Sequence, residues 1–159
     1  MGKAKKTNVI RILDQKNINY NTFQYDKDDG KIDGISVAYK IGKDPKVVYK
    51  TLVAQGSSKN IYVFIIPVSE ELDLKKGAKV AGEKKIDLIP VKEILKVTGY
   101  IRGGCSPIGM KKKYKTFIDT SAFKIEKIVV SGGKIGIQIE IDVSDLIKVT
   151  EAKLENVIK

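Results

Sequence analysis

Three segments of the chain hold residues that suit chemistry on an anion or an acyl group. Gly103-Gly104-Cys105-Ser106-Pro107-Ile108-Gly109 is a glycine-rich loop, whose backbone N–H groups suit a phosphate or a developing oxyanion. Lys50 stands where a proline-started turn enters an apolar run, and there it could place a cation in a cleft. Ser131 ends the apolar run 128–130 at a Gly-Gly pair, a place where a hydroxyl can face a cleft.

Each of these segments also has a purely structural interpretation. The glycine-rich loop follows neither the Walker pattern nor GxGxxG, and a tight turn is the commoner explanation of such a sequence. A lysine at a strand entrance can extend its ammonium group to solvent. Ser-Gly-Gly is a frequent composition of hairpin turns. Taken singly, none of the three segments identifies a site.

The absence of histidine excludes several classes of site. The chain can form no Ser-His-Asp triad, no Cys-His dyad and no His-ligated metal centre. Its single cysteine, Cys105, excludes an internal disulfide and a Cys₄ or Cys₂His₂ zinc site. Without histidine, Cys105 also lacks the usual base, and we interpret it as a buried or half-buried side chain rather than a nucleophile. Any chemistry must therefore use Lys, Ser, Thr, Tyr, carboxylates and backbone groups.

The chain is strongly basic, with a formal net charge of +11 and a pI of about 9.6. No acidic residue occurs between Ile94 and Ile118, whereas that stretch holds Lys96, Arg102, Lys111, Lys112, Lys113 and Lys115. Such clusters attract polyanions through phosphate neutralisation and counterion release. The alternative is an ordinary solvated lysine surface.

Length and periodicity predict one domain over residues 1–159, of the α/β (α+β) class. Alternating and β-branched runs indicate a mixed, mainly antiparallel sheet surrounded by helices. Two pairs of these runs form predicted hairpins, which turn at 56–60 and 132–134. Strands are expected at 20–25, 51–55, 61–67, 87–89, 116–119, 127–131 and 136–141. Helices are expected at 7–17, 35–41, 73–81, 90–97 and 142–158, with a helical turn at 46–49.

The chain carries no recognisable targeting or membrane segment. The basic residues Met1–Lys6 are not followed by an apolar core such as a signal peptide needs. The longest uninterrupted apolar run is Val63–Ile66, whereas a membrane helix needs about 20 residues. We therefore expect a cytoplasmic protein that has no membrane partner and keeps its cysteine reduced.

Five motifs occur in one order and spacing and together resemble a known family. They are Tyr49-Lys50-Thr51-Leu52, Leu72-Asp73-Leu74-Lys75-Lys76, Thr98-Gly99-Tyr100, Gly103 to Lys112, and Val130-Ser131-Gly132-Gly133-Lys134-Ile135-Gly136. The chain resembles the YbaK/EbsC family of aminoacyl-tRNA deacylases, which are related to the editing domain of prolyl-tRNA synthetase. The likeness covers nearly the whole chain, from the first helix to the expected C-terminal helix.

The resemblance implies a compact α/β domain whose sheet curls into a partial barrel and which needs no metal or cofactor. It implies catalytic roles for three groups: Lys50 as a cation that holds the tRNA end, Gly103 as a backbone donor and Ser131 as a positioning hydroxyl. The expected substrate-binding residues are Tyr25, Gly104, Ser106, Gly132 and Gln138. The expected tRNA-binding residues are Arg102, Lys111, Lys112 and Lys113.

The implied reaction is hydrolysis of the ester in mischarged Cys-tRNA(Pro), with the thiol of the substrate attacking its own carbonyl. The implied partners are aminoacyl-tRNA and prolyl-tRNA synthetase, with the protein itself a monomer or weak homodimer. Two residues depart from the family pattern, since Cys105 stands where an apolar residue is usual and Gln138 where Asp is common. A deacylase for Ala-tRNA(Pro) or another small aminoacyl-tRNA is the alternative, and a non-catalytic tRNA- or polyanion-binding module is the second alternative.

Overall fold

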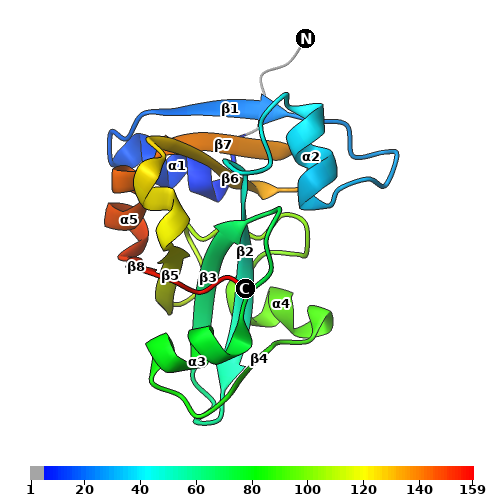
Figure 1. The fold of residues 1–159 in the computed structure, drawn as a ribbon. Helices are drawn as coiled ribbons and strands as arrows, with labels where there is room; N and C mark the ends of the chain where they lie inside the picture. The colour runs from blue at the N-terminus through cyan, green and yellow to red at the C-terminus, as the bar shows by residue number, and fades with distance from the viewer. Residues whose placement is uncertain (1–5) are drawn as a thin grey trace.

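The strands of the protein form two sheets, seen in a computed structural model that describes residues 6–159 (Figure 1). Residues 1–5, most of the basic N-terminal segment considered above, lie outside the described residues. The smaller sheet has the strand order β1-β7-β6, and the larger one has the order β4-β2-β3-β5-β8. The strands are β1 (Tyr20–Gln24), β2 (Tyr49–Gly56), β3 (Ile61–Pro67), β4 (Ile86–Leu88), β5 (Lys115–Asp119), β6 (Lys127–Lys134), β7 (Ile137–Asp142) and β8 (Lys153–Glu155). The helices are α1 (Asn8–Gln15), α2 (Gly34–Lys40), α3 (Leu74–Ala81), α4 (Val91–Thr98), α5 (Val143–Thr150) and the 3₁₀ helix η1 (Thr120–Lys124).

The two sheets meet where β2 begins. A parallel bridge joins Val48, just before β2, to Val129 of β6, and the Val129 N–H donates to the Val47 carbonyl at 2.9 Å. In Figure 1 the smaller sheet lies across the top, and β2 and β3 run downward from beneath it. The predicted class is confirmed, with the difference that the expected single sheet is divided in two. Antiparallel pairs predominate, and the parallel pairs are β3–β5 and β5–β8.

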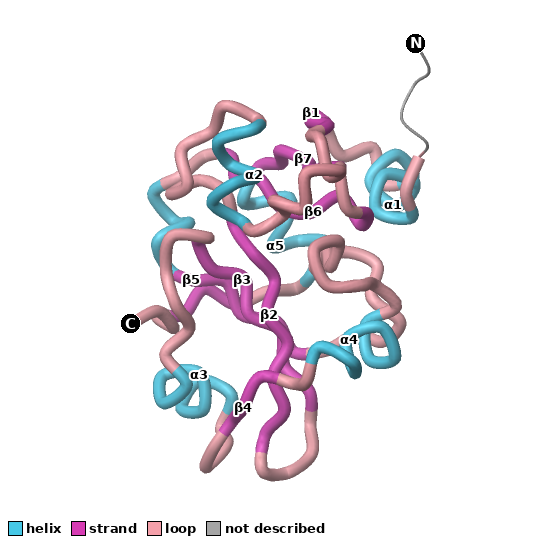
Figure 2. Tube along the Cα trace, turned by 90° about the vertical axis from the view of Figure 1, so that its right-hand side faces the viewer, coloured by secondary structure: helices cyan, strands magenta, loops and turns pink. Residues whose placement is uncertain are grey.

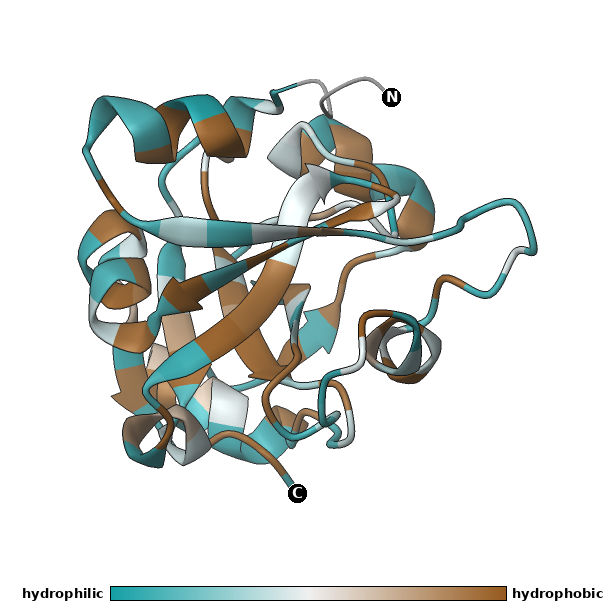
Figure 3. Ribbon diagram, turned by 90° about the horizontal axis from the view of Figure 1, so that it is seen from above, coloured by the Kyte–Doolittle hydropathy of each residue, from teal (hydrophilic) through white to brown (hydrophobic). Residues whose placement is uncertain are grey.

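The hydrophobic core packs both sheets, in part against each other, since Ile65 of β3 belongs to the same cluster as Ile139 of β7. One cluster packs the smaller sheet against α1 and α5, with fully buried side chains such as Leu13, Ile139 and Leu146. A second cluster packs Phe64 and Ile66 of β3 against α3. Figure 3 shows the apolar colouring concentrated on the strands inside the molecule. Each fully buried aliphatic or aromatic side chain contributes about 1.5–3 kcal/mol, and this burial holds the two sheets in their relative places.

Local sequence patterns predicted several helix ends correctly. The Thr7 hydroxyl oxygen accepts a hydrogen bond from the Ile10 N–H at 3.2 Å, which begins α1. Asp73 accepts from the N–H groups of Lys75 and Lys76 at 2.9 and 3.0 Å, which begins α3. Gly82 then ends α3 in the left-handed conformation, with φ of 74°. These predicted boundaries are confirmed.

Three predicted boundaries are wrong. The helix expected over 142–158 ends at Thr150, and 153–155 form β8 beside β5, because parallel pairing outweighs local preference there. The hairpin expected to turn at 132–134 turns two residues later, since β6 continues to Lys134 through an irregular register after Ser131. Only one turn, closed by the Val47 N–H on the Asp44 carbonyl, forms at 44–47 before β2 begins at Tyr49.

Within residues 6–159, no helix combines the length and apolar character that crossing a membrane requires.

Candidate active site

A cavity of about 120 Å³ opens where the two sheets meet, and predicted site residues from distant parts of the chain line it. Lys50 comes from β2, Gly103 from the glycine-rich loop, and Ser131 and Gln138 from β6 and β7. The other lining residues are Ile32, Gly34, Val37, Val48, Tyr49, Thr51, Val68 and Cys105. Figure 2 shows that β2 runs from the level of α2 and β6 down to β4. The start of β2 therefore lies beside the smaller sheet, so residues of both sheets can line one cavity.

Lys50 supplies the positive charge of the cavity. The residue is half-buried in β2, and no ion pair among residues 6–159 includes it. Burial lowers the pKa of Lys50, while the charges of Glu71 and Glu70 oppose that shift. A cation without a paired carboxylate, at the wall of a cavity, is available to an anionic or carbonyl ligand.

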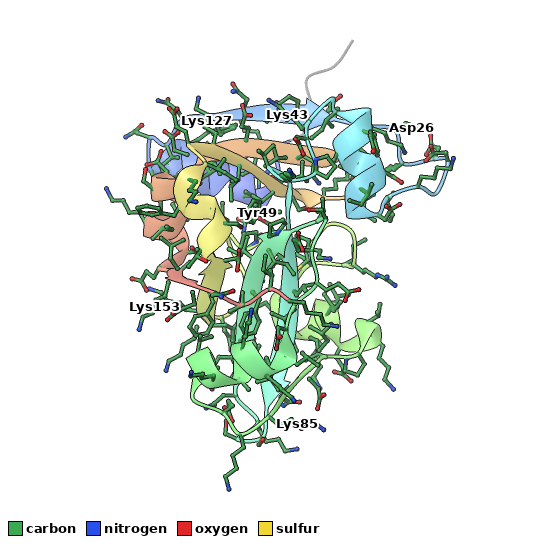
Figure 4. The ribbon with its side chains drawn as sticks, viewed as in Figure 1. Asp26, Lys43, Tyr49, Lys85, Lys127 and Lys153 are labelled. Carbon is green, nitrogen blue, oxygen red and sulfur yellow. The ribbon has the colours of Figure 1, made fainter. Side chains whose placement is uncertain are left out.

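The residue before Lys50 fixes where β2 begins. Tyr49 is 2 % exposed, and its hydroxyl lies 2.7 Å from the Ser121 hydroxyl of η1. Asp119 holds Ser121 in turn, since its carboxylate accepts from the Ser121 N–H at 2.9 Å. Figure 4 shows Tyr49 at the upper end of β2, beneath the smaller sheet. The ring of Tyr49 therefore anchors the strand from which Lys50 projects.

Gly103 has a conformation and surroundings that suit glycine. Its φ of +87° is rarely adopted by other residues, and a Cβ at this position would lie 3.0 Å from Ile32 Cδ1. No backbone acceptor within residues 6–159 takes a hydrogen bond from the Gly103 N–H. The loop thus leaves a backbone donor free beside the cavity, as an oxyanion site requires.

Ser131 lies at the irregular part of β6. Its Oγ accepts a hydrogen bond from the Gly133 N–H at 3.2 Å, so the hydroxyl hydrogen remains able to donate elsewhere. The next carbonyl, that of Gly132, accepts from the Thr7 hydroxyl at 2.6 Å, which ties this segment to α1. These contacts hold Ser131 at the cavity wall.

Gln138 lies directly across the β6–β7 ladder from Ser131. It is 6 % exposed and lines the cavity. The amide therefore adds both a donor and an acceptor to the cavity without adding charge.

The remaining predicted substrate-binding residues do not line this cavity. Tyr25 is 9 % exposed and lies on a second cavity of about 340 Å³ beside Lys27 and Lys134. Gly104 packs closely on backbone, since a Cβ there would lie 3.0 Å from the Ile135 nitrogen. Ser106 and Gly132 are likewise enclosed by neighbouring residues. Ser106 is fully buried and accepts from the Ile108 N–H at 3.3 Å, and a Cβ at Gly132 would lie 2.7 Å from Ile137 Cγ2.

The four predicted tRNA-binding residues differ in their surroundings. Arg102 and Lys112 are exposed and form no ion pair within residues 6–159. Lys113 pairs with Glu151. The Lys111 ammonium donates to the Lys96 carbonyl at the end of α4, at 3.4 Å. Arg102 is the one of the four that adjoins a lining residue of the cavity, Gly103, in the chain.

The positive charge as a whole is not confined to one face. In Figure 4, Lys43 and Lys127 lie near the upper edge of the molecule, Lys153 at its left side and Lys85 at its lower end. Part of the net charge is thus a solvated lysine surface, as the structural alternative supposed.

Sequence reasoning missed Thr51 and the apolar wall made by Val48, Val68 and Val37. Thr51 adjoins Lys50 in the motif Tyr49-Lys50-Thr51-Leu52, and this adjacency is the one local signal that would have included it. The valines come from three separate segments and carry no local signal at all. Their convergence is a property of the tertiary structure.

The sequence matches that of a known class of proteins. A model of the aminoacyl-tRNA editing domain family matches residues 34–149, and the chain belongs to this family. It is 38% identical, over 99% of its length and 98% of the relative's, to a protein of Enterococcus faecalis named "Putative Cys-tRNA(Pro)/Cys-tRNA(Cys) deacylase EbsC". These matches confirm the family predicted from the motifs and the enzyme class that it implies, an aminoacyl-tRNA deacylase.

Solved structures confirm the fold. One described as "a putative trans-editing enzyme for prolyl tRNA synthetase" has a TM-score of 0.86 at 17% identity, covering 99% of both chains. Another, of a hypothetical protein, also has a TM-score of 0.86 at 20% identity, covering 95% of this chain and 99% of the other. At these identities the similarity concerns the architecture, which is the mixed α/β arrangement described above.

Proposed function

We propose that the protein is a free-standing trans-editing enzyme that hydrolyses the ester of mischarged Cys-tRNA(Pro). The observation that carries the proposal is the convergence of the Lys50 cation, the Gly103 N–H and the Ser131 hydroxyl on one cavity. Family membership and the name of the Enterococcus faecalis relative support the substrate class. The basic, acid-free stretch 94–118 supports contact with the tRNA acceptor end.

In this proposal the substrate supplies the nucleophile. The sulfur of the cysteinyl group attacks its own ester carbonyl, and negative charge on the carbonyl oxygen is stabilised by the Gly103 N–H. The bond from the carbonyl carbon to the ribose oxygen then breaks, and the thiol proton passes to that oxygen. A cyclic thioester leaves, and water opens it to free cysteine.

The protein groups would position the substrate rather than react with it. Lys50 holds the tRNA end near the carbonyl, and Ser131 orients the acyl group by donating its free hydroxyl hydrogen. No residue of the cavity has to act as a base in this scheme. This agrees with a chain that lacks histidine.

In this proposal a partner protein distinguishes tRNA(Pro) from other tRNAs. A cavity of about 120 Å³ takes up an acyl group but offers no surface for an acceptor stem or anticodon. We propose that prolyl-tRNA synthetase supplies this selection. Sharp discrimination between Cys-tRNA(Pro) and Cys-tRNA(Cys) by the purified protein alone would contradict this part of the proposal.

The experiment that tests the function compares release of Cys, Ala and Pro from tRNA(Pro) charged with each amino acid. We expect rapid release of Cys, with a cyclic thioester trapped early in the reaction, and little release of Pro. Equal rates for Cys and Ala would instead support a deacylase for small amino acids that activates water. Salt-sensitive tRNA binding without any hydrolysis would support the binding-module alternative.

A further inference from the structure

The Thr51 hydroxyl is an unexplained polar group at the wall of the cavity. Its Oγ1 is buried and has no hydrogen-bond partner among residues 6–159, and Thr51 lines the cavity. Other buried threonines are bonded: Thr98 donates to the Ile94 carbonyl and Thr116 to the Tyr114 carbonyl. Burying a hydroxyl without a partner costs free energy, so such a group in a native protein calls for an explanation, and a ligand contact is one.

Further polar groups line the same cavity. Ser131 Oγ accepts from the Gly133 N–H, which leaves its hydroxyl hydrogen able to donate to a ligand, and the buried Gln138 also lines the cavity. Lys50, the charged group of the cavity wall, adjoins Thr51 in β2. The apolar part of the wall is formed by Val37, Val48 and Val68. The cavity therefore combines a small apolar lining with hydrogen-bonding groups that the protein itself does not satisfy.

We propose that Thr51 is a specificity-determining residue, whose hydroxyl bonds to the sulfur or oxygen of a small polar acyl side chain. This inference rests on the proposed function and concerns which amino acid the cavity prefers. A cysteinyl or seryl group would satisfy the hydroxyl, whereas an alanyl group would leave it unpaired. A site built for a hydrogen bond rejects the analogue that lacks it, because its own polar group is then left buried and unsatisfied.

The Thr51 hydroxyl can form this contact without losing a hydrogen bond. Since Oγ1 makes no hydrogen bond in the free protein, turning it toward a ligand breaks none. Removal of the hydroxyl should accordingly leave the fold intact. This distinguishes Thr51 from Thr116, whose hydroxyl is part of the structure of β5.

The test measures binding rather than turnover. The ligands are acceptor-stem RNA hairpins that end in an amide-linked cysteinyl, seryl or alanyl adenosine, which the protein cannot hydrolyse. The proteins compared are the wild type, Thr51→Val, Thr51→Ser and the control Thr116→Val. The melting temperature of each protein is measured alongside its affinities.

We expect Thr51→Val to keep or raise the melting temperature and to lose about tenfold in affinity for the cysteinyl and seryl hairpins. Its affinity for the alanyl hairpin should be unchanged, and Thr51→Ser should bind like the wild type. Thr116→Val should lower the melting temperature without changing the preference among ligands.

An equal effect of Thr51→Val on all three hairpins, or no effect on any, would overturn the inference. If Thr51→Val fails to fold, the Thr51→Ser variant still tests it, since altered selectivity in a variant that keeps the hydroxyl contradicts the proposal. The proposed function fails separately, if wild-type protein hydrolyses no ester-linked aminoacyl-tRNA.

Discussion

The Cys105 sulfur lies 4.0 Å from the Thr98 hydroxyl, in the wall of the cavity that holds Lys50. Burial raises the pKa of the Cys105 thiol to about 11. The contact with Thr98 lowers this pKa, but its effect is smaller than that of burial. The thiol is therefore protonated at neutral pH. The only cysteine of the chain thus lines the proposed reaction site without the ionisation that a nucleophile needs.

We predict that Cys105→Ala retains deacylation within about threefold of the wild-type rate, because a protonated thiol contributes packing rather than reaction. In the native protein, iodoacetamide should alkylate Cys105 far more slowly than in the denatured protein at the same pH. Mass spectrometry of the alkylated protein measures both rates. Rapid native alkylation coupled to loss of activity would contradict this assignment.

Gly103→Ala should reduce activity strongly, since it strains a backbone with φ of +87° and crowds Ile32. Gly42 is a matched control, with φ of +70° and open space around the added Cβ. Both alanine variants should lose about 1–2 kcal/mol of stability through the left-handed backbone, Gly103→Ala somewhat more through its contact with Ile32, but only Gly103→Ala should lower kcat. Denaturant unfolding and steady-state kinetics make the comparison. A similar kcat for the two variants would show that the loop acts only as a turn.

The rate should fall at alkaline pH as Lys50 loses its proton. Burial lowers its pKa from 10.5, so the cation disappears at a lower pH than for an ordinary lysine. An arginine at this position keeps its charge throughout. We therefore expect the ratio of wild-type to Lys50→Arg rates, corrected for spontaneous hydrolysis, to decline at a pH below that at which an ordinary lysine loses its proton. A flat ratio would mean that the charge of Lys50 does not act in the reaction.

Binding of tRNA should depend unequally on the basic residues of the loop region. Arg102 and Lys112 are free of ion pairs within the described residues, whereas Lys113 is paired with Glu151. We predict that Arg102→Ala and Lys112→Ala each weaken binding and lower the slope of log K against log salt by about 1. Lys113→Ala should have a smaller effect. Equal slopes for all variants and the wild type would place the tRNA interface elsewhere.

The features of this fold that the sequence predicts well are local. The caps at Thr7 and Asp73 and the hairpin of β2 and β3 depend on residues a few positions apart. The strand β8 could not be foreseen, because Lys153–Glu155 become a strand only through pairing with the distant β5. The organisation as one domain over 1–159 stays a prediction.

The site was predictable only in part for the same reason. The order of motifs pointed to Lys50, Gly103 and Ser131, and the structure brings these groups to one cavity. The unpaired state of the Thr51 hydroxyl depends on every neighbour around it, and no spacing in the sequence encodes that. Ser106 was expected at the substrate, but its burial and its contact with the Ile108 N–H are equally invisible in the motif.

Single-turnover deacylation of Cys-tRNA(Pro) by Lys50→Ala tests the central claim most directly. Lys46→Ala is the matched control, since Lys46 is an exposed lysine four residues earlier and does not line the cavity. The account predicts a loss of about 100-fold or more for Lys50→Ala, an unchanged melting temperature, and wild-type activity for Lys46→Ala. Wild-type turnover by a folded Lys50→Ala protein would contradict it.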